Sequence, residues 1–185
     1  MARRISSFTD PLPATLYWDA SFVVNFAYEA ARYFQECADL LARLEDASVI
    51  SYVSTLALDE ACFVLLQLKL EEDHRPAKFW SVYNANPSVI EPYVDDLQEL
   101  TEGILAHPLI RVVGTEPSFA LDALSSMRAF HFLPRDAYHL ATMRHYGLDS
   151  IVTLDADFLP VPDIQICTCA PAILQQALKD QTSQG

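Results

Sequence analysis

Glycine is scarce in this chain, with only 4 among 185 residues. Glycine-rich loops that cradle nucleotide phosphates are therefore absent, and so is the Gly-x-Ser-x-Gly motif of many serine hydrolases. Because 51% of the residues are hydrophobic, enough apolar side chains remain to build a large core. The length fits one domain.

Positive charge is also in short supply. Lys and Arg number 12 against 25 Asp and Glu, which gives a net charge of −13. This balance argues against a nucleic-acid groove lined with Lys and Arg, but it is compatible with a cation site or a basic partner. Eight acidic residues lie between Glu71 and Glu102, against only Arg75 and Lys78. The simplest interpretation of that segment is a solvated helix face.

Long apolar runs are missing as well. The longest candidate, Ala61–Leu66, is far shorter than the ~20 residues of a membrane span. Residues 1–13 contain two arginines with no apolar stretch behind them, which is unlike a secretory signal. We therefore expect a cytoplasmic protein without membrane contact. Among the four cysteines, Cys167 and Cys169 form a lone Cys-x-Cys, which is a weak zinc signal without a second Cys or His pair, so we expect buried, reduced thiols.

The sequence does contain a regular alternation of short apolar runs and helical patterns. Five runs have the form of buried strands: Ala14–Trp18, Ser48–Ser54, Leu109–Val113, Ser150–Leu154 and Ile164–Thr168. Alternation with helices predicts an α/β fold, in which a central parallel sheet of four to five strands is covered by helices on both faces.

We expect a single domain over residues 13–175, with tails at 1–12 and 176–185. Within the domain, residues from about 71 to 108 are predicted to form helices broken near Asn86 and Pro87. This segment is treated as an acidic helical insertion.

Carboxylates recur where the predicted strands end. Asp19 follows the first strand, and Asp155 follows the fourth, with Asp157 two residues later. Glu60 lies in the early turns of the helix after the second strand, and Asp136 lies in the first turn of the helix that feeds the fourth. Ligands of parallel α/β sheets bind beyond the carboxyl ends of the strands, so these side chains are expected at one edge.

Several carboxylates cannot share a small site unaided, because two charges about 5 Å apart repel by roughly 3 kcal/mol at an effective dielectric of about 20. Either some become protonated or a cation fills the site. All-oxygen ligands favour Mg²⁺ or Mn²⁺ over zinc. Such a cation suits phosphodiester hydrolysis, since it activates water and neutralises charge on the phosphate.

Each acid also has a purely structural interpretation. Asp19 could cap the helix that follows it, and Asp136 could complement the dipole of its own helix. Glu60 could be an ordinary surface acid, while Asp155 and Asp157 could shape a turn. The residues alone leave these alternatives open, although placement at one common edge favours a shared site.

Three segments resemble the PIN-domain nucleases, the fold of VapC-type toxins of bacterial toxin–antitoxin pairs. They are "LYWDAS" at 16–21, "VSTLALDEA" at 53–61 and "LPRDAYHLATMRHYGLDSIVTLDADF" at 133–158. The resemblance implies a three-layer α/β/α sandwich and an endoribonuclease that cuts RNA with Mg²⁺ or Mn²⁺. It also implies a homodimer and, in toxin systems, a small antitoxin protein that blocks the site.

The resemblance implies roles for individual residues. The family's catalytic and metal-binding acids correspond to four carboxylates of this chain: Asp19, Glu60, Asp136 and Asp155. Asp157 is then a supporting metal ligand, and Ser21 and Thr153 match small polar positions that line such sites and contact substrate.

Two features depart from the compact toxins of this family. They lack a segment as long as 71–108, which here is either an elaborated helical clip or a partner surface. The negative charge also opposes RNA binding, since three arginines near the site, Arg128, Arg135 and Arg144, can position a phosphate but not steer RNA from afar. Surface ion pairs are the alternative for each. His139, one turn after Asp136, is expected to have a structural or supporting role.

The sequence thus predicts a metal-dependent ribonuclease of PIN type, with Arg135 as a substrate contact. The alternative is a PIN-fold module that binds a protein and has weak or no nuclease activity. A metal-dependent phosphohydrolase for small molecules is a third candidate. Its haloacid-dehalogenase form lacks the second acid, because the first strand ends in Asp-Ala-Ser at 19–21.

Overall fold

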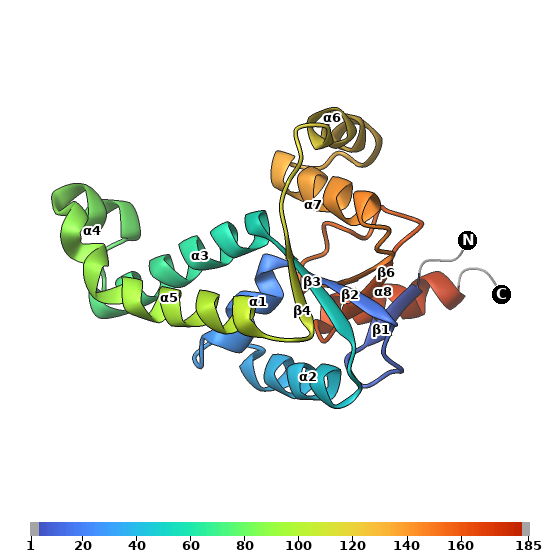
Figure 1. Ribbon diagram of the computed structural model, residues 1–185, viewed down its shortest axis with the longest axis horizontal. Coiled ribbons are helices and arrows are strands. Elements are labelled where there is room, and N and C mark those ends of the chain that lie inside the picture. Colours follow the sequence, from blue (N-terminus) through green and yellow to red (C-terminus); the bar gives the residue numbers. More distant parts are fainter. Residues whose placement is uncertain (1–3, 183–185) are drawn as a thin grey trace.

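One parallel sheet of six strands organises the molecule (Figure 1). The computed structural model describes residues 4–182. The strands lie in the order β1-β6-β5-β2-β3-β4, and every pair is parallel. Their bounds are β1 (Arg4–Ser7), β2 (Thr15–Trp18), β3 (Ile50–Ser54), β4 (Ile110–Val113), β5 (Ser150–Val152) and β6 (Gln165–Thr168). The predicted α/β fold is confirmed.

Helices cover both faces of this sheet. They are α1 (Ala20–Ala27), α2 (Phe34–Asp46), α3 (Thr55–Asp73), α4 (Phe79–Ala85), α5 (Glu91–Ala106), α6 (Phe119–Phe130), α7 (Pro134–His145) and α8 (Pro171–Thr182), with a short 3-10 helix, η1 (Pro87–Ile90). One hydrophobic core joins the sheet to α1, α2, α3 and α5, and a second joins it to α6, α7 and α8. The result is the expected three-layer α/β/α arrangement.

Strand β2 lies in the middle of the sheet and feeds both cores. Leu16 and Trp18 belong to the first core, whereas Tyr17 belongs to the second, as the two-residue period of a strand requires. All three side chains are at most 1% exposed. The residue after this strand, Asp19, is therefore held at the sheet edge by a rigid, fully packed strand.

Local signals fix where two important helices begin and end. Ser54, at the end of β3, accepts a hydrogen bond from the backbone N–H of Ala57 (3.0 Å) and so caps α3. Gly147 follows α7 with a φ of 65°, which glycine adopts without steric strain, and the chain can then turn into β5.

The two ends of the chain differ from expectation. Residues 1–12 are predicted to be a tail, yet Arg4–Ser7 form β1, which pairs with β6 and raises the strand count to six. This short, half-polar segment has no strand pattern of its own, and its partner lies near the other end of the chain. Helix α8 continues to Thr182, so most of the polar tail predicted at 176–185 is helical.

The acidic insertion is helical and has its own small core. Helix α3 continues to Asp73, and α4, η1 and α5 return the chain to β4, so that these helices project away from the sheet (Figure 1). The buried side chains of Leu70, Phe79 and Tyr93 pack together there. The predicted break occurs where α4 ends and Pro87 opens η1.

Two further predictions concern membrane contact and the cysteines. None of the helices in the described part of the chain is long and apolar enough to cross a membrane. All four cysteines are free thiols; Cys37 and Cys167 are buried, whereas Cys62 and Cys169 are partly exposed.

Phe22 provides a test of the first core. Its ring is fully buried and meets Phe8, Trp18 and Phe26 edge-on. We expect Phe22→Ala to lower the free energy of unfolding by about 3–5 kcal/mol, because the cavity would be only partly refilled. Urea denaturation measures the loss. The control Leu121→Ala, at a side chain 73% exposed, should change it by less than about 0.5 kcal/mol. Similar small losses in both variants would contradict the packing described.

Candidate active site

A cavity of about 350 Å³ lies at the carboxyl edge of the sheet. Its walls come from the segments after β2 and β5 and from the early turns of α3 and α7. Four carboxylates from these separate segments line it: Asp19, Glu60, Asp136 and Asp155. We call it the acidic cavity. The structure thus brings together the four acids that the sequence analysis placed at one edge.

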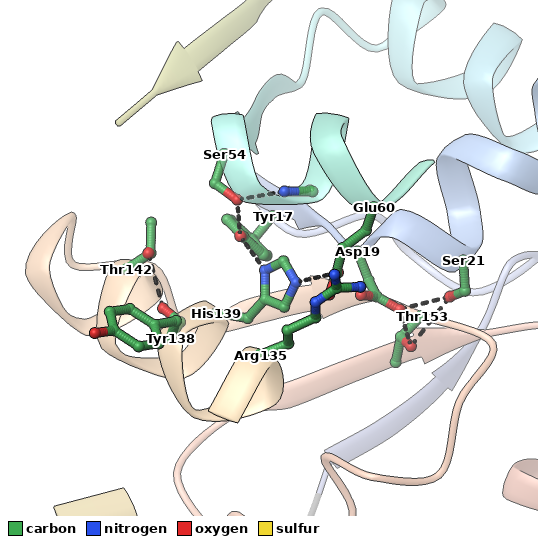
Figure 2. A network of polar contacts seen from close by, with 11 residues as sticks. Tyr17, Asp19, Ser21, Ser54, Glu60, Arg135, Tyr138, His139, Thr142 and Thr153 are labelled. Atoms are coloured by element: carbon green, nitrogen blue, oxygen red, sulfur yellow. Dashed lines mark hydrogen bonds and ion pairs between the residues drawn. The ribbon is translucent and has the colours of Figure 1, made fainter. Parts of the chain in front are cut away.

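Asp19 is held by two hydroxyl groups. Its Oδ2 atom accepts hydrogen bonds from Ser21 Oγ (2.6 Å) and Thr153 Oγ1 (2.8 Å) (Figure 2). The Asp19 side chain makes no capping hydrogen bond to α1, so the capping interpretation is wrong. Ser21 Oγ also accepts a hydrogen bond from the N–H of Leu154, which joins the two strand ends. Thr153 Oγ1 accepts one from the N–H of Asp155 within its own segment.

Glu60 is held by a buried chain of polar groups, drawn in Figure 2. Its Oε2 atom lies 2.8 Å from His139 Nε2, and His139 Nδ1 lies 2.6 Å from the Tyr17 hydroxyl. Tyr17 in turn donates to Ser54 Oγ (2.7 Å), the cap of α3. The side chains of Tyr17, Ser54 and His139 are fully buried. Glu60 therefore has little freedom to move away from the cavity.

Tyr17 was not among the predicted site residues, because its strand resembles an ordinary apolar one. A tyrosine in a strand buried on both faces is the available signal, since a buried phenol needs a polar partner. Burial raises the pKa of Tyr17 far above its ordinary value, so the phenol stays neutral. His139 has the supporting position that was expected of it.

The remaining two acids show how crowded the negative charge is. Burial raises the pKa of Asp136 to about 6, and repulsion from Asp157, Asp19 and Glu60 adds to the shift, while His139 opposes it. Burial, followed by repulsion from Asp19, Asp157 and Glu60, also raises the pKa of Asp155. A helix dipole would stabilise the charged form of Asp136 in the first turn of α7. Asp136 does lie in that first turn, so burial and repulsion outweigh any stabilisation from the helix dipole.

Other predicted site residues lie around the acidic cavity in different ways. Asp157 is exposed and lines a neighbouring cavity of about 220 Å³, which Asp136 also borders. Thr153 is fully buried against Asp19, so its hydroxyl orients that carboxylate and is not available for a substrate contact. Ser21 borders the acidic cavity itself.

The arginines differ in their contacts. Arg135 lines the acidic cavity, is 57% exposed and lies 3.1 Å from Glu60 Oε1 through its Nε atom. Arg144 pairs instead with Asp163 (3.4 Å), in the surface ion pair that was the alternative for it. Arg128 is exposed on α6.

The donor set fits a hard cation. One carboxylate oxygen each of Asp19 and Glu60 and one ring nitrogen of His139 lie within 4.8 Å of one another. Both nitrogens of His139 are engaged by Tyr17 and Glu60, which makes the carboxylate oxygens the better ligands. Burial first, and repulsion from neighbouring carboxylates after it, raise the pKa of Asp136 and of Asp155. A divalent cation would offset that repulsion.

The match to a protein-family model shows which family this chain belongs to. The model of the PIN domain matches residues 16–163, which include all four carboxylates. This chain belongs to the PIN-domain family. None of the curated protein sequences compared with it matches significantly.

Solved PIN-domain-like structures share the fold. VapC20 of Mycobacterium tuberculosis, a toxin that cleaves the sarcin-ricin loop, has a TM-score of 0.55 and 15% identity over 80% of this chain and 96% of its own. VapBC2 from Rickettsia felis, bound to a promoter DNA fragment, has a TM-score of 0.51 and 9% identity, with 83% and 98% covered. PAE2754 from Pyrobaculum aerophilum has a TM-score of 0.51 and 12% identity, with 95% of each chain covered.

The raised pKa of Asp136 generates a stability prediction for the metal-free protein. Its folded value of about 6 exceeds the unfolded value of about 3.9, so the folded state binds more protons between these values. Stability contributed by this group is therefore present below about pH 4 and lost as the pH rises to about 6. We expect the free energy of unfolding of Asp136→Asn to fall less than that of the wild type between about pH 4 and pH 6. Above about pH 6, the variant should be more stable than the wild type.

Urea denaturation at several pH values in the presence of a chelator measures this effect. Asp59→Asn serves as the control, because Asp59 is exposed next to Glu60 on α3 but does not line the acidic cavity. The stability of this variant should depend on pH as that of the wild type does. Parallel curves for Asp136→Asn and the wild type would show that this carboxylate is not strained by its neighbours.

Proposed function

We propose that this PIN-domain protein is a metal-dependent endoribonuclease that hydrolyses RNA phosphodiester bonds. One observation supports the proposal most directly: carboxylates from four separate segments line a single cavity, and burial and mutual repulsion raise the pKa of two of them. Such a cluster is unfavourable for stability and is expected where a cation and a phosphate must be bound.

Asp19, Glu60, Asp136 and Asp155 would hold Mg²⁺ or Mn²⁺, with Asp157 adding negative charge from the neighbouring cavity. The cation supplies two things when bound, an activated water and neutralisation of charge on the phosphate. Ser21 and Thr153 keep Asp19 oriented. His139 and Tyr17 do the same for Glu60, so that the ligands need not reorganise during the reaction.

Arg135 supports substrate positioning. Its guanidinium lies on the cavity wall and pairs with Glu60 through Nε, and its side chain is more than half exposed. A guanidinium can bind two phosphate oxygens at once. If Glu60 held a cation, Arg135 would be available to orient the phosphate next to the cleaved bond.

A role as the toxin of a toxin–antitoxin pair follows by analogy. The fold is that of VapC20, a toxin that cleaves the sarcin-ricin loop, and of VapBC2. We extend the proposal to a cytoplasmic homodimer that a small antitoxin protein blocks. The second candidate function is a PIN-fold binding module without nuclease activity, and the acidic insertion with its own core favours it.

Cleavage of single-stranded RNA distinguishes the two. With Mn²⁺ present, we expect the wild type to cut and Asp19→Asn to lose at least about 100-fold in rate, because one ligand and its fixed geometry are lost. Asp59→Asn, outside the acidic cavity, should cut like the wild type. Equal rates for Asp19→Asn and the wild type would remove the nuclease assignment. Absence of cleavage together with co-purification of a small basic protein would favour the binding module.

A further inference from the structure

Four aromatic rings gather where the insertion meets the middle of α3. We call Phe63, Phe79, Trp80 and Tyr83 the aromatic cluster. The ring of Trp80 lies 5.0 Å from that of Phe79 and 6.1 Å from that of Tyr83, both edge-on, and 6.2 Å from that of Phe63. Phe79 and Tyr83 stack at 5.8 Å. Contacts with these three rings restrict the orientation of the Trp80 ring.

The Trp80 ring is nevertheless open to solvent. Its side chain is 59% exposed, whereas the neighbouring Phe79 is only 5% exposed and belongs to the insertion core. Glu71 fixes the start of α4, because its carboxylate accepts a hydrogen bond from the backbone N–H of Phe79 (3.1 Å). A large, rigid and exposed indole is costly to keep in water and is typical of a contact surface.

The aromatic cluster begins on α3 about one helical turn beyond the cavity residue Glu60. Glu60 and Val64 line the cavity, and Phe63 lies one turn beyond Glu60 and contacts Trp80. Glu71 is eleven residues after Glu60, a rotation within about 20° of three full turns, so both lie on the same face of α3. In the view of Figure 1, α4 and α7 accordingly lie on one side of α3 and α5 on the other. A strand that leaves the cavity along this side of α3 would reach Trp80.

The chemistry of this surface favours a nucleobase. Residues 79–90 contain no charged side chain, although the whole chain has a net charge of −13. A basic protein would be drawn to the acidic residues on either side of this segment. A base needs only an exposed aromatic face, and stacking contributes to binding without positive charge. It would supply affinity that this acidic protein cannot obtain from phosphate contacts.

We infer that Trp80 is a stacking platform for an unpaired base of single-stranded RNA next to the acidic cavity. The inference rests on the proposed ribonuclease function and requires an unpaired base, because a base within a duplex has no free face for the indole. The platform lies in the insertion, the segment by which this chain differs from the compact toxins of the family.

Tryptophan fluorescence tests the inference without relying on cleavage. The chain has two tryptophans, and Trp18 is 1% exposed, so quenching by a ligand in solution reports on Trp80. A mixed-sequence single-stranded RNA oligonucleotide is titrated into Asp19→Asn protein, which binds without cutting. We expect quenching, about tenfold weaker binding for Trp80→Ala by fluorescence anisotropy of labelled RNA, and an intermediate value for Trp80→Phe. Leu105→Ala, at a side chain 60% exposed on α5, is the matched control and should bind like its parent.

The outcomes separate this inference from the proposed function. If the wild type cleaves RNA but Trp80→Ala binds as tightly as its parent, the platform is overturned and the nuclease stands. If single-stranded RNA quenches Trp80 but no cleavage occurs with Mn²⁺, the platform stands and the nuclease fails. Quenching by polylysine and not by RNA would overturn the platform in favour of a protein-docking surface.

Discussion

Repulsion between carboxylates in the acidic cavity is the constraint on which the surrounding structure depends. Asp19 is stabilised there by two hydroxyls, and Glu60 by His139 and Arg135. The pKa values of Asp136 and Asp155 are raised, first by burial and then by repulsion from the neighbouring carboxylates. A cation bound among these groups would stabilise their charged forms, and the same stabilisation would contribute to its affinity.

Contacts beneath the acidic cavity hold its carboxylates in place. Strand β2 lies in the middle of the parallel sheet with side chains packed in both cores, and it delivers Tyr17 under the cavity and Asp19 into it. Tyr17 then connects β2 to the capped start of α3 and to α7 through Ser54 and His139. Three elements that meet only in the folded state are thereby tied together beneath Glu60.

The sequence was informative where chemistry follows local pattern. Asp19 and Asp155 could be placed because strand ends converge at one edge of a parallel sheet, and that rule requires no knowledge of side-chain contacts. Contacts between distant segments were not accessible in this way: β1 pairs with β6, and Tyr17 reaches His139 across 122 positions. The same limit explains Thr153, whose burial depends on packing, and Asp157, which borders a second cavity. The role of Asp157 as a supporting metal ligand stays a prediction.

The most direct measurement is a crystal structure of the wild-type protein soaked with Mn²⁺ near neutral pH, with the metal located by anomalous scattering. We expect a peak inside the acidic cavity, within bonding distance of carboxylate oxygens from Asp19 and from at least one of Glu60, Asp136 and Asp155. An empty cavity at saturating Mn²⁺, or a metal bound only elsewhere on the acidic surface, would contradict it.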